Sequence, residues 1–188
     1  MTAPHLPRVA LVSHCLANQN AKVAEYAICA GCVTPVLSAL RDRGYLVQQM
    51  PCPEMTFLGA ARWWQVRDQY DTPGYRRHCR LVAESVVQIL AHHIAAGCGD
   101  LVILGVDGSP SSGVGLTDSG SSWGGRPAGH PMALVPGRGV WIEVLETVLG
   151  EAGLPRPRLF GLGTELPDFD MASDLARLDA FLDIAGAP

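Results

Sequence analysis

The cysteines are the residues of this sequence best suited to chemistry. There are six of them, at positions 15, 29, 32, 52, 79 and 98. In a small secreted chain this count indicates disulfide bonds, whereas in a cytoplasmic chain of 188 residues it indicates metal binding, catalysis or burial. Cys15 and Cys52 each follow a short apolar run, while Cys29 and Cys32 form a CAGC motif.

A glycine- and serine-rich stretch is the second feature suited to chemistry. The residues VDGSPSSGVG, at 106–115, follow the apolar run LVILG directly. They place Asp107, Ser109, Ser111 and Ser112 just after a predicted strand, where hydroxyl and backbone N–H groups can bind a substrate. The alternative is that serine and glycine only form a tight turn there. The stretch is neither a G-x-S-x-G elbow nor a G-x-x-x-x-G-K-[ST] loop, which argues against an α/β-hydrolase or P-loop enzyme.

Ionisable and aromatic residues near the cysteines complete the candidate set. Glu54, two residues after Cys52, is a candidate for water activation or proton transfer, or else it caps a following helix. His14, beside Cys15, is either a hydrogen-bond donor near the site or a solvated surface residue. A second group is predicted to form a stacking and anion-binding wall for a planar base, or alternatively part of the core. Its members are Arg62, Trp63, Trp64, Arg67 and Tyr70.

Alternating strand and helix patterns must position these residues. Apolar runs predict strands at 8–14, 45–50, 101–106 and 158–163. Helical patterns follow each strand, and the first two begin at a Thr-Pro pair, with Thr34 and Thr72 as predicted N-caps. The order predicts a single α/β domain over residues 1–188, with a Rossmann-like parallel sheet and helices on both faces. The segment 112–139 is expected to be a lid-like loop.

The carboxyl ends of parallel strands meet at one edge, where ligands bind. We therefore expect Cys15, Cys52, Glu54, the serine stretch and Glu165 to share that edge. The cysteines at 79 and 98 fall elsewhere, one on the apolar side of a helix and one before a strand, and both are predicted to be structural.

Composition limits the partners. The chain has 14 basic and 18 acidic residues, so it has no excess of positive charge with which to bind a nucleic acid polymer. No leader pattern and no run of 18 apolar residues is present, so we expect a soluble, cytoplasmic protein without a membrane partner. The oligomeric state is open.

Three segments carry a family resemblance over about residues 8–150. SHCLANQN, MPCPE and GVDGSPSSGVG resemble, in order and spacing, the thiouracil desulfidase-like (TudS-related) desulfidases of the DUF523 group. The resemblance implies a 4Fe-4S cluster held by three cysteines, with one iron free to take sulfur from a thiolated small molecule such as a thio-nucleobase. Cys15 and Cys52 match the first two cysteines, and Ser112 stands where a GSPSCG pattern has the third.

The serine at this position leaves three explanations open, because a hydroxyl is a harder and more basic donor than a thiol. The site is intact but weakened, Cys32 replaces the missing ligand, or the cluster has been lost. Cys32 is the better of the CAGC pair because it lies nearest a predicted helix N-terminus. In the last case the chain is a cluster-free paralogue that binds a small molecule, or a cluster-independent hydrolase.

Overall fold

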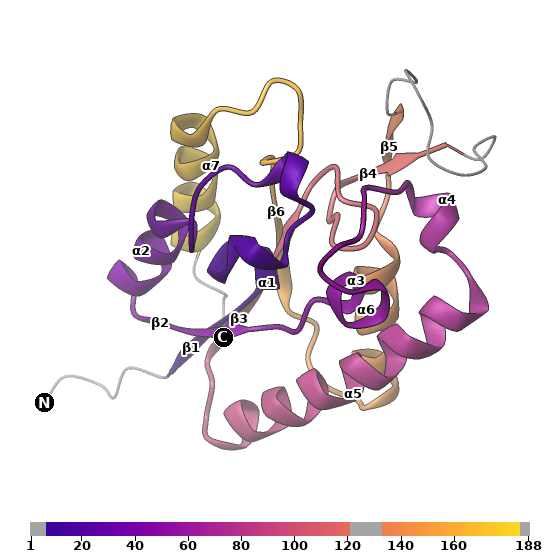
Figure 1. The fold of residues 1–188 in the computed structure, drawn as a ribbon. Coiled ribbons are helices and arrows are strands. Elements are labelled where there is room, and N and C mark those ends of the chain that lie inside the picture. Colours follow the sequence, from indigo (N-terminus) through magenta and orange to yellow (C-terminus); the bar gives the residue numbers. More distant parts are fainter. Residues whose placement is uncertain (1–6, 121–132, 185–188) are drawn as a thin grey trace, which may run out of the picture.

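A four-stranded parallel sheet lies at the centre of the molecule (Figure 1). The structure is a computed structural model and describes residues 7–120 and 133–184. The strand order is β2-β1-β3-β6. The strands are β1 (Arg8–Val12), β2 (Tyr45–Gln49), β3 (Asp100–Val106) and β6 (Arg158–Leu162). All four predicted strands are confirmed, with shifts of one or two residues at some ends.

Helices cover both faces of the sheet, which confirms the predicted Rossmann-like α/β fold. The four long helices are α2 (Thr34–Asp42), α5 (Pro73–Ala95), α6 (Val140–Glu151) and α7 (Met171–Asp183). The Thr72 side chain caps α5 as predicted, accepting from the Tyr75 N–H. The prediction for Thr34 is wrong by one residue, because Val33 is the N-cap and Thr34 already lies in the helix.

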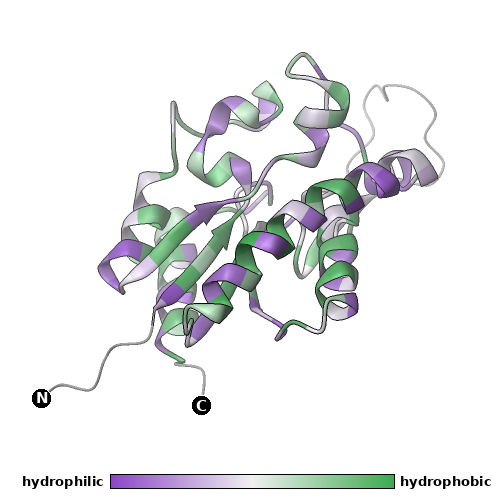
Figure 2. Ribbon diagram, turned by 90° about the horizontal axis from the view of Figure 1, so that it is seen from below, coloured by the Kyte–Doolittle hydropathy of each residue, from purple (hydrophilic) through white to green (hydrophobic). Residues whose placement is uncertain are grey.

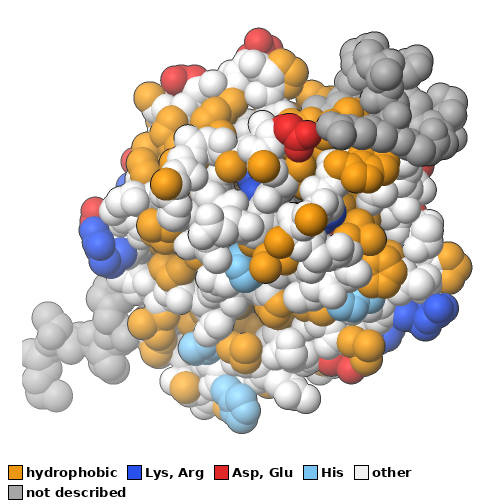
Figure 3. All heavy atoms as spheres, viewed as in Figure 1, with side chains coloured by type: hydrophobic (Ala, Val, Ile, Leu, Met, Phe, Trp, Pro, Cys, Tyr) orange, Lys and Arg blue, Asp and Glu red, His pale blue; other side chains and the backbone are white. Residues whose placement is uncertain are grey.

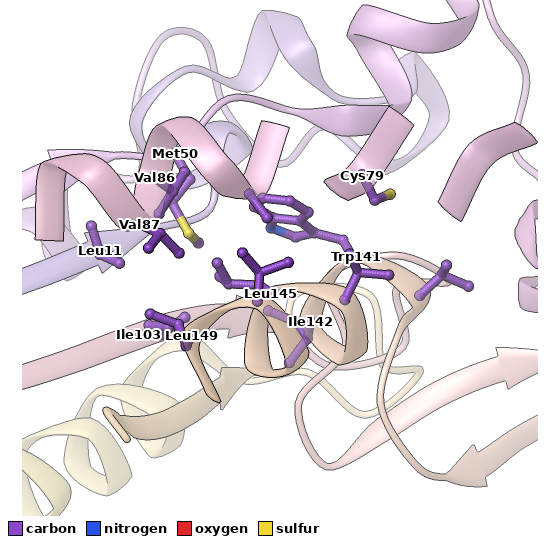
Figure 4. Close-up of a cluster of buried hydrophobic side chains, with 14 of the residues drawn as sticks. Leu11, Met50, Cys79, Val86, Val87, Ile103, Trp141, Ile142, Leu145 and Leu149 are labelled. Atoms are coloured by element: carbon purple, nitrogen blue, oxygen red, sulfur yellow. The ribbon is translucent and has the colours of Figure 1, made fainter. Parts of the chain in front are cut away.

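Each face of the sheet has its own apolar core. Ala10 and Val12 of β1 pack toward α2 and α7, whereas Leu11 packs toward α5 and α6, because side chains alternate along a strand. Figure 4 shows Trp141, Leu145 and Leu149 of α6 facing Val86 and Val87 of α5. In Figure 2 the central strands are largely apolar, while the helices carry apolar and polar stripes.

Several short elements were not expected from the sequence. They are α1 (His14–Ala17), η1 (Gln19–Ala21), η2 (Ala24–Tyr26), α3 (Pro53–Leu58), α4 (Arg67–Tyr70), β4 (Leu116–Ser119) and β5 (Ala133–Pro136). The antiparallel pair of β4 and β5 replaces part of the expected lid-like loop at 112–139. Within that segment Ser112, Val114, Thr117 and Asp118 are buried, so the beginning of the segment is part of the protein interior. Residues 121–132 of the same expectation lie outside the described residues.

The amino ends of the strands carry a polar network. Asp100 accepts hydrogen bonds from Arg8, Tyr45 and Arg158. Cys98 lies at this end, away from the strands' carboxyl ends, and Cys79 is fully buried on α5, which agrees with a structural role for both. No helix in the described part of the chain is long and apolar enough to cross a membrane. On the face shown in Figure 3, Lys and Arg side chains are scattered rather than gathered into one basic area.

Candidate active site

A cavity opens at the carboxyl ends of the strands, where the strand order reverses between β1 and β3. Such a reversal separates the two connecting loops and leaves a crevice for a ligand. The cavity holds about 650 Å³ of empty space, counted out to its open mouth. All four strand ends contribute to its wall. The ionisable and hydroxyl side chains of the wall are Ser13, His14, Cys15, Lys22, Tyr26, Cys52, Glu54, Arg62, Ser109, Ser111, Ser112, Asp118 and Glu165.

Two thiols enter this cavity from different strands. Cys15 lies in α1 just after β1, and Cys52 is the N-cap residue of α3 just after β2. The Cys52 sulfur accepts a hydrogen bond from the Met55 N–H at 3.4 Å. Burial raises the pKa of Cys15 to about 12 and that of Cys52 to about 11. Raised pKa values of this size favour the neutral thiol form of both groups at pH 7.

Glu54 is held by three donors. Its Oε1 accepts from the Ser111 hydroxyl at 2.6 Å, and its Oε2 accepts from Arg62 Nε and the Tyr70 hydroxyl, both at 3.1 Å. The side chain is buried, and it points toward these donors and not toward the free N–H groups of α3. The structure thus favours an oriented carboxylate in the cavity over the alternative of a helix cap.

The serine stretch is anchored on α6. The carbonyl groups of Pro110 and Ser111 accept from the Val140 and Trp141 N–H groups, each at 3.0 Å, at the start of that helix. On the other side of the stretch the Ser112 N–H and hydroxyl both lie in hydrogen-bond contact with Ser109 Oγ, at 3.2 and 3.1 Å. Both serines line the cavity.

Asp107 does not line the cavity. Its Oδ1 accepts three backbone N–H groups, from Val114, Gly115 and Leu116, at 2.9, 2.8 and 3.2 Å. The predicted substrate contact of Asp107 therefore finds no support in its position. The carboxylate shapes the chain between the serine stretch and β4.

Other predicted residues divide into those near the cavity and those away from it. His14 lines the wall, with Nδ1 at 3.0 Å from Gln49 Nε2, and burial lowers its pKa. Arg62 also lines it, and its guanidinium lies 3.9 Å from the Cys52 sulfur. Trp63 does not line the wall, whereas its neighbour Trp64 does.

Two further expectations are corrected by the positions of the side chains. Tyr70 donates to Glu54, and Arg67 pairs with Asp71 and Glu143, so neither contributes to the predicted stacking wall. Cys32 does not line the cavity. Its sulfur contacts the Thr34 hydroxyl at 3.5 Å, and Cys32 is half-buried at the end of the otherwise exposed CAGC segment before α2. Cys32 is therefore not placed to replace a ligand at position 112.

Three ionisable residues of the wall were missed or undervalued by sequence reasoning. Lys22 forms a buried ion pair with Glu165 at 3.2 Å, and it is the only lysine beside 13 arginines, which is a signal that the sequence contained. Burial raises the pKa of Glu165, and that of Asp118 is raised to about 8 by burial and by Glu165 and Glu54. Asp118 gave no sequence signal, because β4 was not expected.

The donor set of the cavity fits a cluster with two thiolates and one serine oxygen. Among residues 7–120 and 133–184, no three side chains of the types His, Cys, Asp and Glu are arranged to hold a metal ion. The Ser112 hydroxyl lines the same wall as Cys15 and Cys52, so it is the group that could serve as a third ligand if a cluster binds there. Oxygen is a harder donor than sulfur, so such a cluster is expected to be more weakly held than one with three thiolates.

Comparisons with known proteins identify the family of the chain. The chain is 34% identical over 86 residues to an uncharacterised protein of Methanocaldococcus jannaschii, which covers 46% of this chain and 55% of that protein. The chain thus spans about half the length of this curated relative. No solved structure matches. Residues 9–128, which include both cavity thiols and the whole serine stretch, match the family described as "Putative 2-thiouracil desulfurase". The chain therefore belongs to this desulfurase family.

Proposed function

We propose that this protein is a desulfidase that converts the C=S group of a thiolated small molecule, such as a thio-nucleobase, to C=O. The observation that carries the proposal is the meeting of Cys15, Cys52, Glu54 and Ser112 in one cavity from three separate strand ends. The chain's membership in a family described as "Putative 2-thiouracil desulfurase" supports the same reaction class.

Cys15, Cys52 and Ser112 would hold an iron–sulfur cluster at this wall. When bound, such a cluster would supply a Lewis acid for the sulfur of the substrate. The two thiols and the Ser112 hydroxyl line one wall, so they could bind the same cluster. The thiolates would be soft ligands of iron, and the serine oxygen would be a harder one.

The chain's own residues supply water activation, proton transfer and charge stabilisation. In the net reaction a water oxygen forms a bond to the thiocarbonyl carbon, the C–S bond breaks, and both water protons leave with sulfide. Glu54 accepts the first proton from water, since its carboxylate is fixed by Arg62, Tyr70 and Ser111. Ser109 donates a hydrogen bond to the substrate, and the Lys22 ammonium stabilises negative charge that develops in the cavity.

Reconstitution of four proteins tests the proposal: wild type, Ser112→Cys, Cys52→Ala and Cys32→Ala. Iron and acid-labile sulfide per chain are measured under anaerobic conditions, together with sulfide released from 2-thiouracil. We expect Ser112→Cys to raise the iron content and the broad absorbance near 400 nm, because a thiolate then replaces a poorer donor at the same position.

Cys32→Ala is the matched control, since it removes a thiol outside the cavity. It should retain the iron content of the wild type, whereas Cys52→Ala should lose it. If Cys32→Ala loses the cluster and Ser112→Cys changes nothing, the ligand assignment is wrong. If none of the four proteins binds iron, the chain is a cluster-free paralogue, either a small-molecule binding protein or a hydrolase.

A further inference from the structure

One wall of the cavity carries an acidic side chain that the proposed reaction does not use. Asp118 lies in β4, and only 2% of its surface is exposed. Its Oδ1 has no hydrogen-bond partner among the residues that the structure describes. A buried oxygen left in this state costs about 1–3 kcal/mol, which proteins rarely accept without a role for the group.

The surroundings of Asp118 favour the neutral form of its carboxyl group. Burial is the largest cause that raises its pKa to about 8, and the acidic groups Glu165 and Glu54 of the cavity wall raise it further. The Lys and Arg side chains of the cavity wall form ion pairs with other acids, Lys22 with Glu165 and Arg62 with Glu54. Arg67 of the adjacent α4 pairs with Asp71 and Glu143. A neutral carboxylic acid has one donor and one acceptor side by side.

We propose that Asp118 determines substrate specificity by pairing, as a neutral acid, with the N–H and C=O (or C=S) edge of a cyclic amide or thioamide ring. The inference rests on the proposed function, and it assigns the recognition of one edge of the substrate ring to a single side chain. Such an edge also has one donor beside one acceptor, in the reverse order, so the two groups form a closed pair of hydrogen bonds. An ionised carboxylate could not form this pair of hydrogen bonds, because a carboxylate has no hydrogen-bond donor.

Binding to four versions of the full chain tests this assignment: wild type, Asp118→Asn, Asp118→Ala and the control Asp42→Asn. Asp42 is an exposed acid at the end of α2, so its variant reproduces the charge change away from the cavity. Calorimetric titration at pH 6.5 uses 2-thiouracil and 1,3-dimethyl-2-thiouracil, in which methyl groups replace both ring N–H groups. Thermal melts confirm that each variant is folded.

The amide of Asp118→Asn keeps a donor beside an acceptor, so its affinity for 2-thiouracil should stay within about threefold of the wild type. Asp118→Ala should lose about tenfold or more. The dimethyl compound should bind the wild type about tenfold more weakly than 2-thiouracil does, and should lose nothing further in Asp118→Ala. Equal affinity of Asp118→Ala and wild type for 2-thiouracil would overturn the inference. A loss in Asp118→Asn as large as that in Asp118→Ala would show an ionised group and would overturn it as well.

Sulfide release from 2-thiouracil separates this inference from the proposed function. A wild type that binds 2-thiouracil with the expected dependence on residue 118, but releases no sulfide, contradicts the desulfidase and supports the specificity assignment. Sulfide release at the same kcat/KM in wild type and Asp118→Ala supports the desulfidase and contradicts the assignment. A wild type that binds neither compound contradicts both.

Discussion

Replacement of Asp107 should destabilise the protein more than the replacement of any exposed acid. Asp107 is 8% exposed, and its Oδ1 accepts N–H groups from three consecutive residues, Val114 to Leu116. Asp107→Ala removes the acceptor of all three at once. Because Val114 is buried, water cannot easily replace the carboxylate there.

The magnitude follows from the number of bonds. A hydrogen bond to a charged group contributes about 1.5–3 kcal/mol, and three bonds to one oxygen are not additive, so we expect a loss of about 3–5 kcal/mol. For a domain of this size that loss lowers Tm by roughly 6–20 °C. Asp107→Asn keeps the acceptor oxygen and loses the charge, so its cost should be about 1–2 kcal/mol.

Urea unfolding followed by circular dichroism measures these differences, with Asp42→Ala as a control that should lie within about 0.5 kcal/mol of the wild type. The order of the two variants is the most informative result, because Asp107→Ala must lower the free energy of unfolding more than Asp107→Asn does. An Asp107→Ala protein as stable as the wild type would show that the carboxylate does not hold the segment between the serine stretch and β4.

Three further predictions concern the same end of the sheet. Gly161→Ala should destabilise the protein by about 1–3 kcal/mol in urea unfolding, because a methyl group there would overlap the Asp107 carboxylate; an unchanged midpoint would contradict the close contact. Glu54→Gln should lower the rate of sulfide release by about 10²–10⁴-fold with the iron content unchanged, since an amide cannot accept the proton from water; retained turnover would exclude Glu54 as the base. Asp118→Asn should be more stable than the wild type at pH 8 and equally stable near pH 4, in thermal melts. The folded pKa of Asp118 is raised to about 8, and the unfolded value is about 3.9, so the unfolded chain loses its proton first and wild-type stability falls between these pH values. A stability difference that does not change with pH would contradict the raised pKa.

The sequence determined the sheet and the edge at which the candidate site lies. Local patterns were enough to predict these elements. The run LVILGV predicts a buried strand, and Thr72-Pro73 predicts the start of a helix, without information from distant parts of the chain. The order of strand and helix then placed Cys15 and Cys52 at one edge, since parallel strands share their carboxyl ends. The resemblance of three short segments led to the desulfurase family.

Only the tertiary structure decided what each polar side chain contacts. Asp107 and Ser111 are four residues apart in one stretch, yet one faces the backbone of the next segment and the other faces Glu54. Asp118 enters the cavity because β4 pairs with β5, a contact between segments that carry no strong strand pattern. Cys32 lies outside although its sequence position suggested the opposite. The direction of a side chain in an irregular segment depends on distant partners, and neither periodicity nor spacing along the chain records them.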